Sequence, residues 1–166
     1  MFKTAAAAKP STSAISIRPA RLEDKEFILE LSERVEATGA PHWRQDGPNP
    51  YTTDWIDHIL QNNPQDQAIL IAESEDGVAL GYSWILILTE FDANIPHGHI
   101  AGIGVSPAAE SRGVGAQLVQ AGEDWCRGHG LSEVTLHCYI ANERAHHLYS
   151  RLGFENEWYH MRKGLS

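Results

Sequence analysis

The sequence predicts an α/β protein in which a mixed sheet carries helices on both faces. Three observations support this prediction. Strand-like and helix-like segments follow one another in the order β-α-α-β-β-β-α-β-α-β-β, the dipeptide Asp76-Gly77 is a strong hairpin signal, and a glycine loop at Gly113-x-Gly115 joins a strand to a helix. A length of 166 residues suits one domain with a sizeable core. We expect residues 15–166 to form it and residues 1–14, rich in Ala, Ser and Thr, to be a disordered tail.

The first elements follow from alternation and helical spacing. Residues 15–19 alternate and end at a proline, which predicts a strand. A helix is expected next, with Phe27, Ile28, Leu31 and Val35 on its apolar face. After a loop over residues 41–51, Thr53 is expected to cap a second helix.

The centre of the chain is predicted to be a run of strands. Residues 68–72 and 78–88 flank the hairpin signal, and residues 99–105 form the next strand. Gly102 and Gly104 inside that strand indicate a bulge or a close backbone approach.

Two helices and further strands complete the order. The helix after Gly113 should bury the face formed by Val114, Leu118, Ala121 and Trp125. Residues 131–139 are then expected to form a strand. The last helix should start at Asn142 and end at Gly153, and residues 154–163 should supply one or two more strands.

Composition narrows the function. The net charge of −9 argues against nucleic acid or an anionic membrane as a partner and suits a cationic amine, although solubility alone explains the charge as well. Two cysteines outside any C-x-x-C motif favour a cytoplasmic location. The chain has no apolar run long enough for a membrane helix, and its histidines have no metal-ligand spacing, so we expect no metal.

The glycine loop is the strongest chemical signal. Glycines at the mouth of a helix let backbone N–H groups approach a ligand, and the positive end of the helix favours a phosphate or pyrophosphate. A P-loop would require Gly-Lys-Ser/Thr, which is absent. A dinucleotide fingerprint would require a third glycine where Leu118 stands. Both nucleotide-binding interpretations are therefore poor.

Two segments together resemble the GNAT family of acyl-CoA-dependent N-acyltransferases. The loop V-S-P-A-A-E-S-R-G-V-G-A is similar to the family's (Gln/Arg)-x-x-Gly-x-(Gly/Ala) pyrophosphate loop, and N-E-R-A-H-H-L-Y-S-R-L-G-F, about 27 residues later, is similar to its N-x-x-A-x-x-x-Y-x-x-x-G-F segment. The resemblance covers nearly the whole chain and implies a mostly antiparallel sheet. One position departs from it, because Glu110 stands where the family usually has Gln or Arg.

The resemblance implies acetyl-CoA as co-substrate and a role for each motif. His99 would be the general base and Tyr149 the acid that protonates the leaving thiolate. The acceptor site would include His42, Trp43, Tyr51 and His97. The residues implied to hold the cofactor are Ile103, Gly104, Val105, Glu110, Ser111, Arg112, Gly113, Val114, Gly115, Ala116, Asn142, Ala145 and Tyr149.

Simpler interpretations stand beside several of these roles. His99 is equally a surface histidine at a strand start, and Asn142 equally a helix cap. The expected function is transfer of an acetyl group to a primary amine by direct attack, in a chain that could form a homodimer. The alternative is a catalytically silent module that binds or senses acyl-CoA, and Glu110 keeps it open. The acceptor stays undetermined among polyamines, aminoglycoside-like compounds, amino acids and protein amines.

Overall fold

The computed structural model describes residues 14–38, 40–41, 50–89, 95–161 and 163. The predicted tail, apart from Ala14, lies outside this part of the chain, so its disorder stays a prediction. Five strands form one sheet in the order of the chain: β1 (Ile15–Pro19), β2 (Gln67–Ser74), β3 (Ala79–Thr89), β4 (Pro96–Val105) and β5 (Val134–Leu136). The first four pair antiparallel and β5 pairs parallel to β4, which confirms the mixed, mostly antiparallel sheet.

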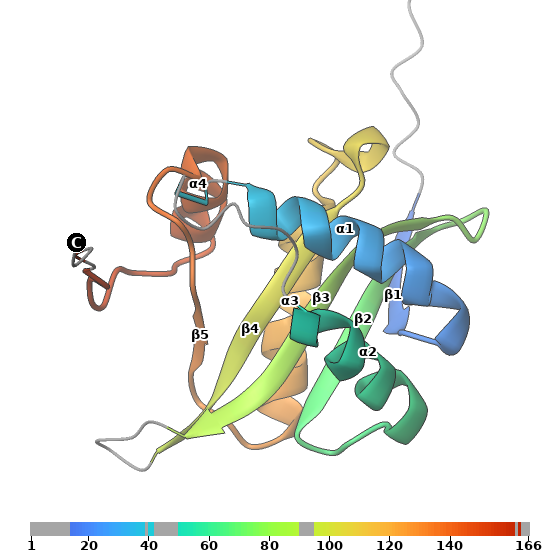
Figure 1. The fold of residues 1–166 in the computed structure, drawn as a ribbon, viewed down its shortest axis with the longest axis horizontal. Helices are drawn as coiled ribbons and strands as arrows, with labels where there is room; N and C mark the ends of the chain where they lie inside the picture. The colour runs from blue at the N-terminus through green and yellow to red at the C-terminus, as the bar shows by residue number, and fades with distance from the viewer. Residues whose placement is uncertain (1–13, 39, 42–49, 90–94, 162, 164–166) are drawn as a thin grey trace, which may run out of the picture.

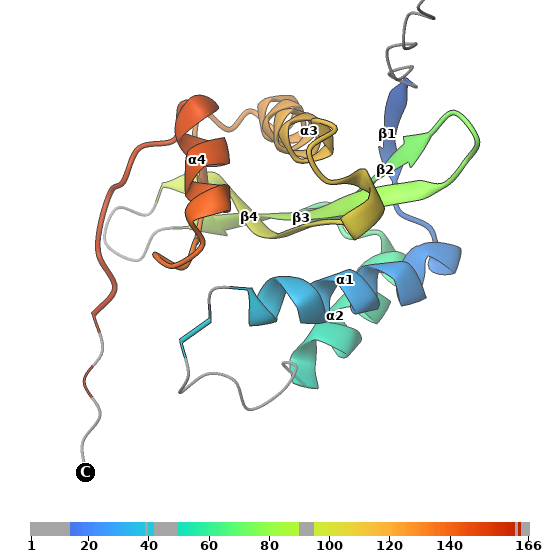
Figure 2. The ribbon, with the colours of Figure 1, turned by 90° about the horizontal axis from the view of Figure 1, so that it is seen from above.

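The helices cover the sheet on both sides, as predicted. On one face lie α1 (Lys25–Ala37) and α2 (Pro50–Asn62), preceded by the short helix η1 (Leu22–Asp24). On the other face lie α3 (Val114–Gly128) and α4 (Glu143–Arg151), with the short helix η3 (Pro107–Ala109) leading into α3 (Figures 1 and 2). The three layers agree with an α/β domain.

Each face of the sheet has its own core. Under α1 and α2 the buried residues are Ile28, Leu31, Ile56, Ile59, Ile69, Ile71 and Tyr82. Under α3 they are Ala72, Leu80, Ile85, Ile100, Ala109, Val114, Leu118, Val119 and Cys126. Gly98 marks how tightly α3 lies on β4, because a Cβ there would meet the Cys126 sulfur at 2.1 Å. Only glycine fits at this crossing.

A bulge in β4 shapes the far end of the sheet. Trp84 of β3 pairs with Gly102 and its neighbour Ile85 pairs with Ile100, so Ala101 has no partner on β3. Pairing of β4 with β5 covers only Gly98–Ile100 and stops at the same point. From Ala101 to Val105, the edge of β4 that faces away from β3 is not paired with β5. This stretch is called the open edge of β4 below.

Several predicted boundaries were wrong. The second helix begins at Pro50 and not at Thr53, because Pro fits the first turn of a helix. Within the predicted strand over residues 131–139, only Val134–Leu136 forms a strand. Residues 154–161 contain no strand, and Trp158 and Tyr159 within them are exposed. The buried face of α3 includes Val119, Gly122 and Cys126, whereas Ala121 and Trp125 are only partly buried.

Other local predictions are confirmed. The hairpin turns at Gly77, which has a φ of 78°, and the bulge lies beside Gly102. Gly153 follows α4 with a φ of 93°, as a terminating glycine should. Within the described residues, no helix combines the length and apolar character needed to cross a bilayer.

A cluster of ion pairs connects β1 to η1, the short helix that precedes α1. The Arg18 guanidinium donates to both Asp24 carboxylate oxygens, at 2.7 and 2.9 Å, and to Glu73 Oε2 at 2.7 Å. Asp24 is buried and also accepts the Arg21 backbone N–H. These hydrogen bonds, that from Arg18 above all, hold the pKa of the Asp24 carboxyl below its ordinary value.

Replacing Asp24 tests this cluster. Asp24→Asn should lower the free energy of unfolding by roughly 2–3 kcal/mol at pH 7, because charged hydrogen bonds are lost in a buried place. A depressed carboxyl pKa stabilises the fold above the ordinary value near 4 and loses its effect as the pH falls through the lowered value. The difference between wild type and variant, measured by urea unfolding, should therefore shrink below about pH 4.

Glu23→Gln is the matched control, because its ion pair with Arg21 is exposed on both sides. It should change stability by less than about 1 kcal/mol. Equal losses in the two variants would show that Asp24 has no special structural role.

Candidate functional site

The loop between β4 and α3 has the geometry of an anion site. Ser111 and Gly113 both adopt left-handed backbone angles, with φ of 62° and 82°, and Gly113 directly precedes α3. The first backbone N–H groups of a helix have no partner within the helix and carry partial positive charge. Such turns directed at a helix start form a concave nest for a phosphate. Sequence reasoning identified Gly113 but had no signal for the left-handed Ser111.

The neighbouring positions of the loop divide between exposed and packed. Ser111, Arg112 and Gly113 are exposed, whereas Val114 is buried in the core under α3 and Ala116 is partly buried. The loop backbone is therefore open to solvent while its downstream end is anchored in the core.

Gly115 lies at a close contact between three elements. A Cβ there would lie 3.2 Å from Leu148 Cδ2 in α4 and 3.8 Å from Val105 Cγ2 in β4. The missing side chain lets the start of α3 approach both elements closely. At Gly113, in contrast, an added Cβ would have nothing within 4 Å, so only its backbone angle calls for glycine.

Glu110 has two cationic partners. Its Oε1 accepts a hydrogen bond from Arg34 in the last turn of α1, and its Oε2 accepts one from Arg144 in the first turn of α4. These two guanidinium groups, Arg144 first, hold the pKa of the Glu110 carboxyl below its usual value. Arg34 also donates to the Val105 carbonyl oxygen at 3.1 Å. The acid in the loop is thus neutralised, and neither arginine was identified from the sequence.

The open edge of β4 ends beside this loop. Ile103 packs against the core under α3, and Gly104 faces Tyr82, since a Cβ at Gly104 would lie 2.7 Å from the ring. The side chains of this stretch are thus directed to the two faces of the sheet. The backbone along the edge has no strand partner in β5. The predicted close approach at Gly104 is confirmed.

His99 is buried. Its side chain is 7% exposed and its Nδ1 lies 2.8 Å from Thr135 Oγ1 of β5. Burial, with further contributions from His137 and His97, lowers the pKa of His99 to about 4. His99 is therefore neutral near pH 7, and the interpretation of it as a surface histidine is wrong. His97, one alternation earlier in β4, is 6% exposed.

The contacts of Thr135 indicate which nitrogen of His99 is free. The Thr135 hydroxyl donates to the Gly98 carbonyl oxygen at 3.4 Å and has no second proton to give. In the tautomer that satisfies both contacts, His99 donates through Nδ1 and keeps its lone pair on Nε2. His137, whose ring meets that of His99 at 4.8 Å, was not identified from the sequence. The alternation of Thr135 and His137 along one predicted strand was the signal that could have found it.

Tyr149 lies on the inward face of α4. Its ring packs edge-to-face on Phe154 at 5.8 Å and against the core under α3. Burial, and secondly the neighbouring Cys138, raises the pKa of Tyr149 to about 12. The phenol is therefore protonated at neutral pH and can donate a proton.

Asn142 caps α4, which confirms the structural interpretation of this residue. Its Oδ1 accepts the backbone N–H of Ala145 at 3.2 Å. The cap fixes the first turn of the helix that carries both Arg144 and Tyr149. A contact of Asn142 with a cofactor stays a prediction.

The predicted acceptor site is only partly described. His42 and Trp43 lie outside the described residues, and Tyr51 belongs to the first turn of α2. Trp55, further along α2, packs against Trp84 of β3 with ring centroids 5.8 Å apart. Its ring is thus engaged in local packing.

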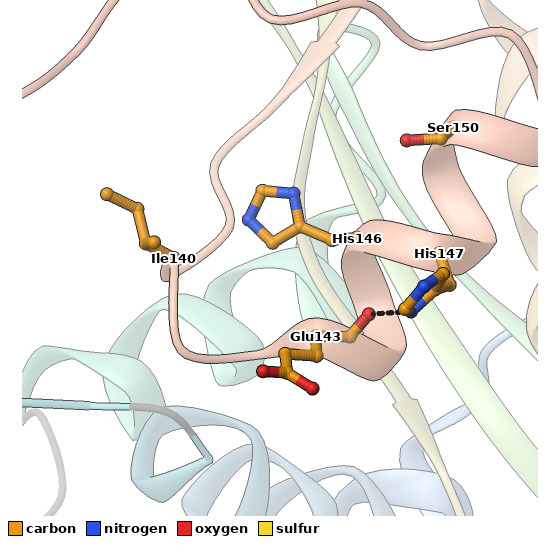
Figure 3. Close-up of a pocket in the computed structure, with 5 residues that line it drawn as sticks. All are labelled: Ile140, Glu143, His146, His147 and Ser150. Atoms are coloured by element: carbon orange, nitrogen blue, oxygen red, sulfur yellow. Dashed lines mark hydrogen bonds between the residues drawn. The ribbon is translucent and has the colours of Figure 1, made fainter.

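A hollow of about 320 Å³ lies on the outer face of α4 (Figure 3). It is lined by Ile140, Glu143, His146, His147 and Ser150, and the spacing of the four helical residues places them away from Tyr149. His147 donates to the Glu143 backbone carbonyl at 2.8 Å. Among the described residues, no group of three or more His, Cys, Asp or Glu side chains is arranged to hold a metal ion.

Comparisons with known proteins agree with this geometry. The profile of the Acetyltransferase (GNAT) family matches residues 33–154. The mycothiol acetyltransferase of Propionibacterium freudenreichii is 34% identical over 110 residues, which is 66% of this chain and 32% of that protein. The chain spans about a third of the length of the curated mycothiol acetyltransferases it matches.

Solved structures share the fold. The BH1408 protein from Bacillus halodurans, solved as a mutant, superposes with a TM-score of 0.78 at 18% identity and covers 91% of this chain and 99% of its own. Aminoglycoside N-acetyltransferase AAC(6′)-Iy in complex with CoA superposes with a TM-score of 0.70 at 25% identity, over 94% of this chain and 99% of its own. With the family profile covering most of the chain, this protein belongs to the acetyltransferase (GNAT) family.

Proposed function

We propose that this protein is an acetyl-CoA-dependent N-acetyltransferase that moves the acetyl group to a primary amine by direct attack in a ternary complex. The observation that carries the proposal is the open edge of β4, which runs directly into the anion-binding loop before α3. The loop would hold the pyrophosphate through backbone N–H groups. The edge would hold the pantetheine arm by backbone hydrogen bonds, which places the thioester near His99 and Tyr149.

The chemistry assigns one proton to each of two residues. Nε2 of His99 takes a proton from the ammonium of the acceptor, and the freed amine attacks the thioester carbonyl carbon. A backbone N–H of β4 polarises the carbonyl oxygen. As the C–S bond breaks, Tyr149 donates its phenolic proton to the leaving thiolate, while the attacking nitrogen loses its second proton to solvent, from which the phenolate is reprotonated. No acyl-enzyme is needed, because neither cysteine is paired with a base among the contacts described.

The acceptor class follows from the relatives. They include mycothiol acetyltransferases and an aminoglycoside N-acetyltransferase, so we infer a small-molecule amine as the acceptor. The acidic surface agrees with a cationic substrate. The alternative of a catalytically silent acyl-CoA-binding module loses its support. That alternative rested on the acid at Glu110, whose charge is paired with two arginines.

Gly113→Asp tests the cofactor site. Wild type should gain thermal stability with acetyl-CoA, since the ligand binds only the folded state. The variant should lose this gain, because it places a carboxylate where the phosphate would lie. Melting temperature with and without millimolar acetyl-CoA is the measurement.

Gly77→Asp is a matched control. Gly77 has a φ of 78°, close to the 82° of Gly113, and likewise has nothing within 4 Å of a Cβ. Backbone strain and added charge are therefore the same, and this variant should keep the gain. A full gain in folded Gly113→Asp would contradict the placement of the phosphate.

Tyr149→Phe tests the acid. It should lower kcat on the order of 10²-fold with little change in acetyl-CoA affinity, because only the proton donor is lost. Tyr82→Phe is the control: that phenol is also buried with its pKa raised to about 12, but it is hydrogen-bonded to Ser32 in the other core. Tyr82→Phe should reduce stability and leave kcat near wild type. Unchanged turnover in Tyr149→Phe would assign the proton to another donor.

His99→Ala tests the base through the pH profile. Activity should fall most below about pH 8 and recover partly above it, where the amine loses its proton unaided. Because the pKa of His99 is about 4, the wild-type profile should show no limb from this residue near pH 6.5.

The exposed His129 provides the comparison, and His129→Ala should leave the profile unchanged. A His99→Ala profile that is only scaled down would exclude His99 as base. The base would then be His97 or a water chain; an acid such as Glu73 could otherwise serve, but its carboxylate is paired with Arg18.

A further inference from the structure

Glu110 joins three elements that meet at the anion-binding loop. The carboxylate bridges Arg34 at the end of α1 and Arg144 at the start of α4, while its own backbone belongs to the loop. Figures 1 and 2 show these helix ends at the same end of the sheet, with α1 on one face and the body of α4 on the other. The bridge therefore spans from one helical layer to the other across the place where β4 and β5 part.

Both arginines stand on helix ends that are fixed locally. Thr38 Oγ1 donates to the Arg34 carbonyl at 2.7 Å and closes the last turn of α1. The Asn142 cap orders the first turn of α4 around Arg144. A cation suits the C-terminal end of α1 but is unfavourable at the N-terminal end of α4, where the helix dipole is positive. Glu110 offsets that cost at Arg144.

The cluster is cationic on an acidic protein. Two guanidinium groups and one carboxylate sum to +1, whereas the whole chain carries −9. In the contacts described, Arg34 donates to Glu110 and Val105, and Arg144 donates to Glu110. A guanidinium has five N–H donors, so both retain donors for a phosphate.

We propose that Glu110 is a positioning residue for acyl-CoA: it holds Arg34 and Arg144 beside the loop so that both guanidinium groups bind the phosphate groups. This inference rests on the proposed function. The arginine side chains are 46% and 63% exposed, and without the carboxylate they would gain the freedom of long surface side chains. Their preorganised position lowers the entropy lost on binding.

A bare carboxylate would have the opposite effect. An acid beside a pyrophosphate repels it, so removing the acid should tighten binding. The proposal instead requires weaker acetyl-CoA binding when Glu110 is removed, because Arg34 and Arg144 then lose their fixed positions beside the loop. The sign of the effect therefore separates the two possibilities.

The experiment measures the Kd of acetyl-CoA by calorimetry and the steady-state constants of the full chain. Glu110→Ala and Glu110→Gln should weaken acetyl-CoA binding roughly three- to tenfold, an effect limited by solvent exposure of the pairs. KM for acetyl-CoA should rise, while kcat and KM for the amine stay unchanged. Glu33→Gln removes an exposed acid next to Arg34 and should leave Kd within about twofold of wild type.

The decisive variant combines all three residues. In the Arg34→Ala/Arg144→Ala background Glu110 has lost both partners, so adding Glu110→Ala should tighten acetyl-CoA binding, the reverse of its effect in wild type. A loss of the same size in both backgrounds would overturn the proposal, as would tighter binding of Glu110→Ala alone. Wild type that fails to bind acetyl-CoA would instead refute the proposed function.

Discussion

The bulge at Ala101 is the constraint on which the site depends. Over Gly98–Ile100, β4 is held on both sides, by β3 and by β5. Beyond the bulge it keeps β3 alone, and its other backbone edge is left for a partner that is not a strand. The same strand then leads into the loop in which Ser111 and Gly113 adopt left-handed backbone angles before α3. A single strand thus presents an unpaired backbone edge and the loop proposed to bind the cofactor in succession.

The two faces of the sheet separate the histidines of β4 from its apolar side chains. His97 and His99 share one face, and Ile100 and Ile103 share the other, where Tyr149 packs. The proposed base and the proposed acid therefore lie on opposite faces of the sheet, on either side of the gap between β4 and β5. The low pKa of His99 is a consequence of the same placement, because burial penalises its charged form.

The sequence predicted the family, the sheet and the loop because these depend on local signals. The hairpin at Gly77, the cap at Asn142 and the glycine at Gly113 are each required by backbone geometry within a few residues. The roles of His99, Tyr149 and the cofactor residues remain predictions. What the sequence could not show are contacts between distant segments. Arg34 and Arg144 lie 76 and 34 residues from Glu110, and nothing near either one marks it as a partner. The strands expected after Gly153 were wrong: residues 154–161 contain no strand, and a strand-like segment becomes a strand only where a neighbour exists to pair with it.

The short pairing between β4 and β5 also affects where the structure opens locally. Three residue pairs connect β5 to the sheet, against nine between β3 and β4. Local opening follows the least supported seams of a structure, so β5 and α4 form the unit that separates first from the rest. Amide hydrogens of Val134–Leu136 should exchange with solvent faster than those of β3, and a ligand seated in the seam would slow them. The seam proposed to admit a long, thin substrate is thereby also the least supported junction of the sheet.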